Sequence, residues 1–275
     1  MFFKTMKKSL LLILFVVVLT SCGEYQKMLK NPDSGLKYAM AEKLYNKGKY
    51  KKALKLMEQI VPVYRGKPQA EKLMFMYANT YYQLEDYYLS GYQFERFTIS
   101  YPKSDSVELA SYNSATSYYQ LSPRYSLDQK DTYTGLEKLQ AFIDTYPNSD
   151  YRTEANKKVN ELTLKLQTKD IEVAKQYLKT GLALNSYKNA IAAFDNFISD
   201  HPGSIYRKDA YFGRLQAQYE LALQSVPQKI NDRLKVSLEY YDDFVKYFSN
   251  SDLMEQAEEI KKDVEIRLGT VEVPS

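Results

Sequence analysis

A short motif that recurs four times constrains the fold of this chain more than any other feature. In each copy a phenylalanine is followed four residues later by an aromatic ring, then at once by Pro or Ser, and two residues after that by Ser. A small Ala closes each copy. The four copies occupy residues 97–110, 142–155, 197–210 and 244–257. Internal self-similarity of this kind is typical of stacked structural repeats, which normally work as binding surfaces.

The motif has the order of a helix end, a turn and a helix start. Phe97 is the last large apolar residue on a predicted buried face. Pro102 cannot continue the helix, because it lacks an N–H group and its ring clashes with the preceding turn. Ser104 can accept a hydrogen bond from a free N–H group that opens the next helix. Ala110 leaves room for two helices to approach closely. The sequence therefore predicts an all-α array of helical hairpins.

The residues before each turn resemble the tetratricopeptide (TPR) repeat. A small residue, three others, a large apolar residue and seven others precede each Pro position, as in the A-x3-F…P half of that repeat. A further repeat, upstream of the four copies, supplies more of the pattern. It has Gly48 in its turn, but Arg65 stands where Pro is expected. We predict an α-solenoid of about five TPR-like helical hairpins over residues 35–268, followed by a tail over 269–275.

The amino terminus predicts a signal peptide that ends in a lipidation site. Three lysines within residues 1–8 precede an apolar run over residues 10–19. This run is too short to cross a bilayer, which takes about 20 residues, but it suits the core of a signal peptide. The Leu-Thr-Ser-Cys that follows resembles a bacterial lipobox, in which the cysteine is acylated and becomes the first mature residue. Cys22 is the only cysteine in the chain.

These observations predict a lipoprotein signal peptide over residues 1–21 and a lipidated tether over residues 22–34. The second mature residue is Gly23, whereas Asp at this position favours retention of enterobacterial lipoproteins in the inner membrane. We therefore expect a lipid-anchored protein at the periplasmic face of the outer membrane. Several acyl chains on one cysteine anchor a protein stably in a membrane, whereas a single acyl chain gives only marginal binding.

The charges favour an adaptor over a nucleic-acid-binding protein. Without residues 1–21, the chain carries 35 Lys and Arg against 34 Asp and Glu. Charges alternate in sign along the predicted helices, as between Lys51 and Glu58. Such alternation is typical of solvated helix faces and differs from a basic stripe that follows phosphates. We expect no nucleic acid among the partners.

The tyrosines predict a peptide-binding groove. The chain has 27 Tyr and no Trp, and many tyrosines are adjacent. Neighbouring helix residues point about 100° apart, so on the TPR frame Tyr81 and Tyr118 face the core, whereas Tyr82 and Tyr119 face the inner groove. Tyr, Asn and Gln combine apolar contact with hydrogen bonds, although we expect at least half of the rings to pack helices together. The predicted groove comprises Tyr38, Tyr45, Phe75, Asn79, Tyr82, Gln83, Tyr112, Tyr119, Arg124 and Tyr125.

One loop departs from the repeat pattern. Residues 122–129, Ser-Pro-Arg-Tyr-Ser-Leu-Asp-Gln, separate the two helices of the third predicted repeat, where a TPR usually has a tight turn. Inserted loops on one face of a solenoid often carry binding. This loop, the lipobox, the tether at Tyr25–Leu29 and the Tyr-Pro-x-Ser repeats together resemble the BamD family, in a version like that of the Bacteroidetes. That family is the TPR lipoprotein subunit of the outer-membrane β-barrel assembly machine.

The resemblance implies a periplasmic scaffold that binds unfolded outer-membrane barrel proteins and docks the barrel-forming subunit, with accessory lipoproteins as further partners. It implies that the amino-terminal repeats receive the carboxyl-terminal strand of a substrate and that the carboxyl-terminal repeats hold the periplasmic domains of the barrel subunit. We predict one patch of Tyr82, Tyr119, Arg124 and Tyr125 for a peptide that ends in an aromatic residue. Arg124 would bind the terminal carboxylate through charge-assisted hydrogen bonds.

Two other functions share the same expected fold and anchor. One is a TPR adaptor lipoprotein for peptidoglycan or cell-division partners. The other is a glycan-binding TPR lipoprotein, a class that is usually about twice as long and rich in exposed Trp, whereas this chain has no Trp. Partner capture from solubilised membranes separates the three functions, because a barrel protein, a murein enzyme or a transporter would co-purify.

Catalysis has little support in the sequence, and we expect neither an enzyme nor a cofactor. His201 is the only histidine and occupies the aromatic position of the repeat motif, where it is expected to pack. A zinc site needs several Cys or His residues, and this chain has one of each. No phosphate-binding or dinucleotide glycine motif occurs. Adjacent carboxylates such as Asp242 and Asp243 point apart on a helix, so they form a poor acid/base pair.

The lipobox generates a first prediction. Cys22→Ala should remove the acylation site, so the protein should appear in the soluble fraction or remain as a precursor in the inner membrane. Membrane fractionation measures this outcome. Sedimentation of the variant with the outer membrane, in cells where its protein partners are removed, would contradict the anchor assignment.

Overall fold

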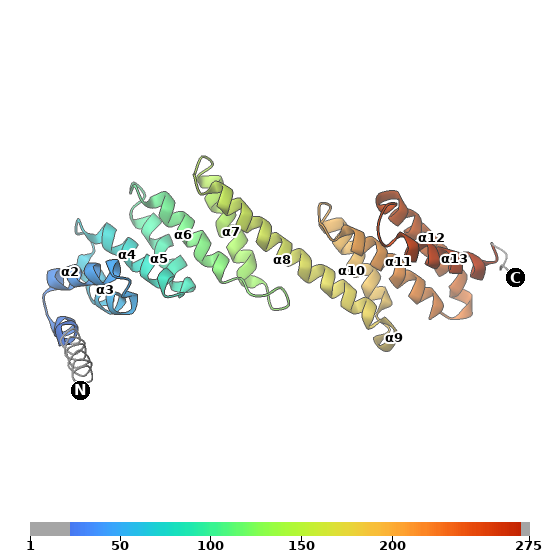
Figure 1. Cartoon of the computed structure of the whole chain (residues 1–275), viewed down its shortest axis with the longest axis horizontal. Coiled ribbons are helices and arrows are strands. Elements are labelled where there is room, and N and C mark those ends of the chain that lie inside the picture. The colour runs from blue at the N-terminus through green and yellow to red at the C-terminus, as the bar shows by residue number, and fades with distance from the viewer. Residues whose placement is uncertain (1–22, 271–275) are drawn as a thin grey trace, which may run out of the picture. The chain divides into compact units, whose positions relative to one another are not determined.

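The computed structural model describes residues 23–270, so the signal peptide and Cys22 lie outside the described residues. The described chain is built from helices (Figure 1). No helix within residues 23–270 is long and apolar enough to cross a membrane. A short helix over residues 23–30 comes first. The helices that follow are α2 (Ser34–Asn46), α3 (Tyr50–Tyr64), α4 (Ala70–Gln83), α5 (Tyr87–Ser100), α6 (Val107–Gln120), α7 (Lys130–Thr145), α8 (Arg152–Lys179), α9 (Gly181–Leu184), α10 (Tyr187–Asp200), α11 (Arg207–Leu223), α12 (Pro227–Phe248) and α13 (Met254–Leu268).

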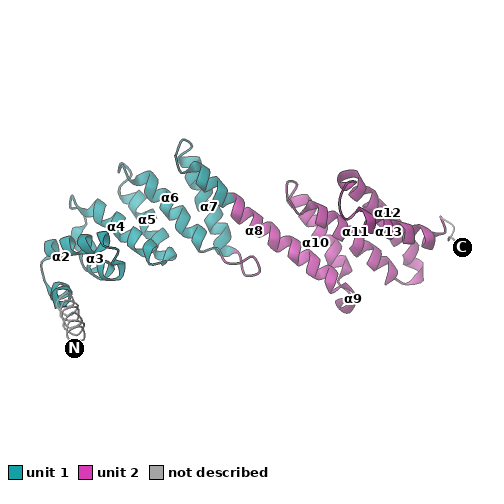
Figure 2. Cartoon of the chain, in the orientation of Figure 1, with its two compact units in different colours: residues 1–122, 130–159 teal, residues 123–129, 160–275 magenta. Residues whose placement is uncertain are grey.

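The described chain divides into two compact units (Figure 2). Within the described residues, the first unit holds 23–122 and 130–159, and the second holds 123–129 and 160–270. The boundary falls inside α8, which has 28 residues and is the longest helix described. The loop over 123–129 groups with the second unit, although the helices on either side of it belong to the first.

Each unit is a stack of TPR-like helical hairpins, as the sequence predicted. In the first unit, consecutive helices pack in order from α2 to α7. In the second unit, α10, α11, α12 and α13 pack in order, and the last part of α8 joins them through Ile171 and Ala174. The all-α repeat class is therefore confirmed by the packing of the helices themselves.

The repeated motif forms the core of these hairpins. Its four phenylalanines are at most 2% exposed, and its four closing alanines are 0% exposed. Each phenylalanine ring also packs against the aromatic ring four residues later, with centroids 4.8–5.7 Å apart. His201 is one of these rings and lies against Phe197, as expected for a packing residue. The interpretation of the motif as helix end, turn and close helix approach is therefore confirmed.

The serine of the motif makes two hydrogen bonds, of which the sequence predicted one. The Ser104 hydroxyl oxygen accepts from the N–H of Ser106 at 3.0 Å, at the start of α6. The same hydroxyl donates to the Glu71 carboxylate on α4 at 2.6 Å. Ser149 repeats this bond to Glu108, and Ser204 donates to the side-chain oxygen of Gln167. Three of the four turn serines therefore also tie their turns to the preceding hairpin, whereas the Ser251 hydroxyl accepts from the N–H of Leu253 at 3.2 Å. The paired positions are Ser104–Glu71, Ser149–Glu108 and Ser204–Gln167.

Overpacking tests the register of the repeats in the second unit. Ala210 is 0% exposed and packs with Ala190, Phe194 and Phe197. Ala210→Phe should force these helices apart, which typically costs about 1–3 kcal/mol. The melting temperature should fall by about 2–4 °C for each kcal/mol in a chain of this size. The matched control is Ala141→Phe on the exposed face of α7, and an equal midpoint in the two variants would contradict the assigned packing.

Candidate peptide-binding site

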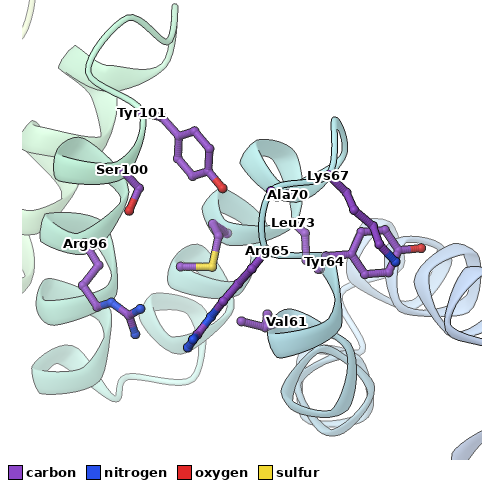
Figure 3. Close-up of a pocket in the computed structure, with 11 residues that line it drawn as sticks. Val61, Tyr64, Arg65, Lys67, Ala70, Leu73, Arg96, Ser100 and Tyr101 are labelled. Carbon is purple, nitrogen blue, oxygen red and sulfur yellow. The ribbon is translucent and has the colours of Figure 1, made fainter.

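A pocket of about 430 Å³ opens in the first unit between α3, α4 and α5 (Figure 3). Its floor is apolar and includes Leu73, which is 1% exposed, together with Val61 and Met74. Its rim carries the polar and charged groups of the turn after α3 and of the end of α5. The complete lining is Val61, Tyr64, Arg65, Gly66, Lys67, Ala70, Leu73, Met74, Arg96, Ser100 and Tyr101.

The rim exists because the first repeat departs from the motif. Helix α3 ends at Tyr64, and Arg65 takes an extended conformation with φ −53° and ψ 126° where the other turns carry Pro or Ser. Gly66 follows with φ +76°, a left-handed conformation that glycine adopts without steric cost. The chain therefore leaves the helix in an open turn, which leaves Arg65 exposed at the pocket.

Positive charge dominates the rim. Arg65, Lys67 and Arg96 line the pocket, and none of the three forms an ion pair within the part of the chain that the structure describes. Figure 3 shows the side chains of Arg65 and Arg96 extending toward the same side of the pocket. The Lys67 ammonium lies over the Tyr64 ring at 4.9 Å. A cationic rim above an apolar floor favours a ligand that carries an anionic group next to an apolar one.

Tyr101 supplies a neutral hydroxyl at the pocket. Its ring packs against Phe97 with centroids 5.2 Å apart. Burial raises the pKa of Tyr101, and the Glu71 carboxylate raises it further. The phenol therefore stays protonated at neutral pH and can donate a hydrogen bond to a ligand.

The structure places the predicted groove residues of the first two repeats mainly in helix packing. The Tyr38 ring stacks on Tyr64 at 5.3 Å. Asn79 donates from its amide to the Tyr45 hydroxyl at 2.5 Å. Phe75 packs edge-on against Phe94 and Phe97, each at 5.5 Å between centroids. These rings are half-buried, as expected for residues that pack helices together.

The remaining groove residues divide between the two units. In the first unit, Tyr82 packs edge-on against Tyr87, Tyr112 stacks on Tyr151 at 4.7 Å, and the Lys158 ammonium lies over Tyr119 at 5.0 Å. Gln83 is exposed at the end of α4. Arg124 and Tyr125 are exposed and belong to the second unit, whereas Tyr82 and Tyr119 belong to the first. The single patch predicted from these four residues stays a prediction, and the pocket between α3, α4 and α5 is the rival site for the same peptide.

One buried glutamine organises the loop over residues 123–129. The Gln129 amide nitrogen donates to the backbone carbonyls of Arg124, Tyr125 and Leu127 at 2.9, 3.2 and 3.0 Å. Lys169 on α8 donates to the same Leu127 carbonyl at 2.6 Å. A hollow of about 510 Å³ lies between this loop and the second-unit part of α8. Its lining is Tyr125, Ser126, Lys169, Glu172, Val173, Lys175, Gln176, Lys179 and Thr180.

Sequence reasoning missed Arg65, Lys67 and Arg96 as candidate site residues. The one available signal was the departure of Arg65 from the Pro position of the repeat, because a break in a repeat marks a place where the backbone differs. Arg96 had no such signal, since it lies within an ordinary helix pattern on α5. Within residues 23–270, no group of three or more His, Cys, Asp or Glu residues could hold a metal ion.

The fold defines a helical-repeat protein of the TPR class. The sequence pattern of YfiO, described as outer membrane lipoprotein, matches residues 31–234, and the chain belongs to this family.

Two curated relatives are both named outer membrane protein assembly factor BamD. The one from Caulobacter vibrioides is 29% identical over 129 residues, which cover 47% of this chain and 41% of that relative. The one from Rickettsia prowazekii is 24% identical over 189 residues, which cover 68% of this chain and 72% of that relative. Among solved structures, the TPR2AB domain of yeast Sti1 in its complex with pHSP90 has a TM-score of 0.38 and 12% identity. That match covers 84% of this chain and 98% of the other.

The role of Gln129 can be tested by removing its donor. Gln129→Glu replaces the amide nitrogen by an oxygen that faces three carbonyls, so the loop should open locally. Loss of a buried hydrogen-bonded donor costs about 1–3 kcal/mol. Amide hydrogen exchange of residues 124–128 should therefore accelerate roughly 5- to 150-fold, as measured by mass spectrometry. Gln120→Glu at the exposed end of α6 is the control, and equal exchange in both variants would contradict the bracing role.

Proposed function

We propose that this protein is a scaffold subunit of the machinery that assembles β-barrel proteins in the outer membrane. It is held at the periplasmic face by acyl chains on Cys22. Three observations support this role: membership of a family of outer membrane lipoproteins, two relatives that are named assembly factors, and the lipobox before Cys22.

The observation that carries the substrate role is the pocket of the first unit. The carboxyl terminus of a barrel strand that ends in an aromatic residue offers a carboxylate beside a large ring. Arg65 and Arg96 would bind the carboxylate, because guanidinium–carboxylate hydrogen bonds are charge-assisted and well matched in geometry. The ring would enter the apolar part of the pocket near Leu73 and Met74, with Tyr101 as a neutral donor beside it.

The second unit is proposed to dock the periplasmic domains of the barrel-forming subunit. The hollow between the 123–129 loop and α8 supports this assignment. Tyr125 and Val173 are 40% and 42% exposed there, and Lys169 and Lys179 lie among them. Interfaces that combine exposed aromatic rings with polar rims are typical of protein docking.

Peptide binding tests the pocket directly. A fluorescent peptide copied from the last strand of a barrel protein should bind the mature chain, and binding is measured by anisotropy. Arg65→Gln with Arg96→Gln should weaken binding roughly 10- to 150-fold, as expected for losing a hydrogen bond to a charged group worth about 1.5–3 kcal/mol. A peptide with an amidated carboxyl terminus should bind the parent as weakly as the free-acid peptide binds the double variant.

Control variants separate this pocket from the patch predicted in the sequence. Arg124→Gln, Tyr82→Ala and Tyr119→Ala should bind the peptide as the parent does. Weakened binding in these three variants, with parental affinity in the Arg65 and Arg96 double variant, would move the substrate site away from the pocket. Melting curves of all variants exclude unfolding as the cause.

A further inference from the structure

Positive charge is concentrated at the amino-terminal end of the mature chain. Residues 23–55 contain nine lysines and three carboxylates, whereas residues 56–275 contain 26 Lys and Arg and 31 Asp and Glu. The net charge of the mature chain is therefore close to zero only because a basic amino-terminal segment and a slightly acidic remainder offset each other. A segregated charge of this kind points to a partner surface of the opposite sign.

The short helix over residues 23–30 is fixed to this hairpin. Tyr25 is 7% exposed and packs with Leu44 of α2 and Ala53 of α3. The Tyr25 hydroxyl donates to the backbone carbonyl of Lys52 at 3.3 Å, and the Lys52 ammonium lies over the Tyr25 ring at 5.1 Å. The first described residues are thus held against the basic hairpin.

Four lysines converge on one hollow beside Tyr25. The hollow has a volume of about 140 Å³, and its charged lining consists of Glu24 and the lysine cluster, defined as Lys43, Lys47, Lys49 and Lys52. Lys43, Lys47 and Lys49 are exposed, and none of them forms an ion pair within residues 23–270. One carboxylate against four ammonium groups leaves a local excess of positive charge that an anionic surface can neutralise.

We propose that the lysine cluster docks on the anionic phospholipid head groups of the membrane that holds the acyl chains of Cys22. This inference rests on the lipid-anchor part of the proposed function and is independent of the peptide pocket. Tyr25 is three residues from Cys22, so its backbone lies within about 10 Å of the acylated residue even if the chain between them is fully extended. The Debye length at physiological ionic strength is about 8 Å. Tyr25 thus lies little more than one Debye length from the acylated residue, so the field of an anionic membrane surface is weakened but still acts on the lysines beside it.

The expected consequence is a second, electrostatic attachment beside the acyl chains. A polybasic patch next to a lipid anchor strengthens membrane binding, and each lysine near an anionic surface contributes about a five-fold gain in partitioning. Three exposed lysines together correspond to roughly a 100-fold gain. This attachment would hold the first hairpin against the membrane surface instead of leaving it to swing on the anchor.

The test uses the unacylated mature chain with Cys22→Ser, because acyl chains would hold every variant on a vesicle. Its partitioning onto vesicles of phosphatidylethanolamine and phosphatidylglycerol is measured by co-sedimentation. The parent should prefer these vesicles over vesicles of phosphatidylethanolamine and phosphatidylcholine. The triple variant Lys43→Gln, Lys47→Gln, Lys49→Gln should partition roughly 100-fold less onto the anionic vesicles.

A control triple variant changes the net charge equally at exposed lysines of the second unit, Lys188→Gln, Lys229→Gln and Lys235→Gln. It should partition as the parent does. Equal partitioning of both triple variants, or no preference of the parent for anionic vesicles, would overturn the proposal. A third outcome would also overturn the proposal. If the parent binds an acidic synthetic peptide but not anionic vesicles, and the triple variant at Lys43, Lys47 and Lys49 no longer binds that peptide, the cluster belongs to a protein partner. Barrel-peptide binding measured on the same variants reports separately on the substrate pocket.

Discussion

The stack depends on the burial of one phenylalanine per motif beneath the alanine of the next helix. Phe97 packs with Ala110, Phe197 with Ala210 and Phe244 with Ala257 in three separate core clusters. Burial of such a ring contributes about 1.5–3 kcal/mol relative to exposure, but only if the facing residue is small enough to let the helices approach. Each hairpin therefore depends on its successor to complete its core, as in other repeat proteins.

The same constraint leaves little freedom at the close contacts. A Cβ atom on Gly213 would lie 2.4 Å from the Phe194 ring, so this position accepts no side chain without movement of the helices. The turn serines add polar ties between hairpins at the edge of the core. Rigid hairpins of this kind hold side chains in place at their ends, which is what a binding pocket requires.

The candidate sites lie where the repeat is broken. Arg65 replaces the Pro of the motif, and the open turn that results forms the rim of the first-unit pocket. The loop over 123–129 replaces a tight turn, and Gln129 supplies the hydrogen bonds that the loop backbone would otherwise lack. Charge follows a similar division, since Arg65, Lys67 and Arg96 line the pocket and the lysine cluster lines the hollow of the first hairpin, whereas residues 56–275 are slightly acidic.

The sequence by itself determined the helical-repeat class, the buried positions of the motif and the family. These follow from local chemistry, because proline ends a helix, serine satisfies free N–H groups and a spaced Phe–Ala pair packs wherever it recurs. Only the tertiary structure decided which aromatic rings pack between helices, as Phe75 does. It also decided which cations from distant segments line one pocket, as Arg65 and Arg96 do. It also decided that the 123–129 loop groups with the second unit. Such outcomes depend on contacts between residues far apart in the chain, and no local spacing encodes them.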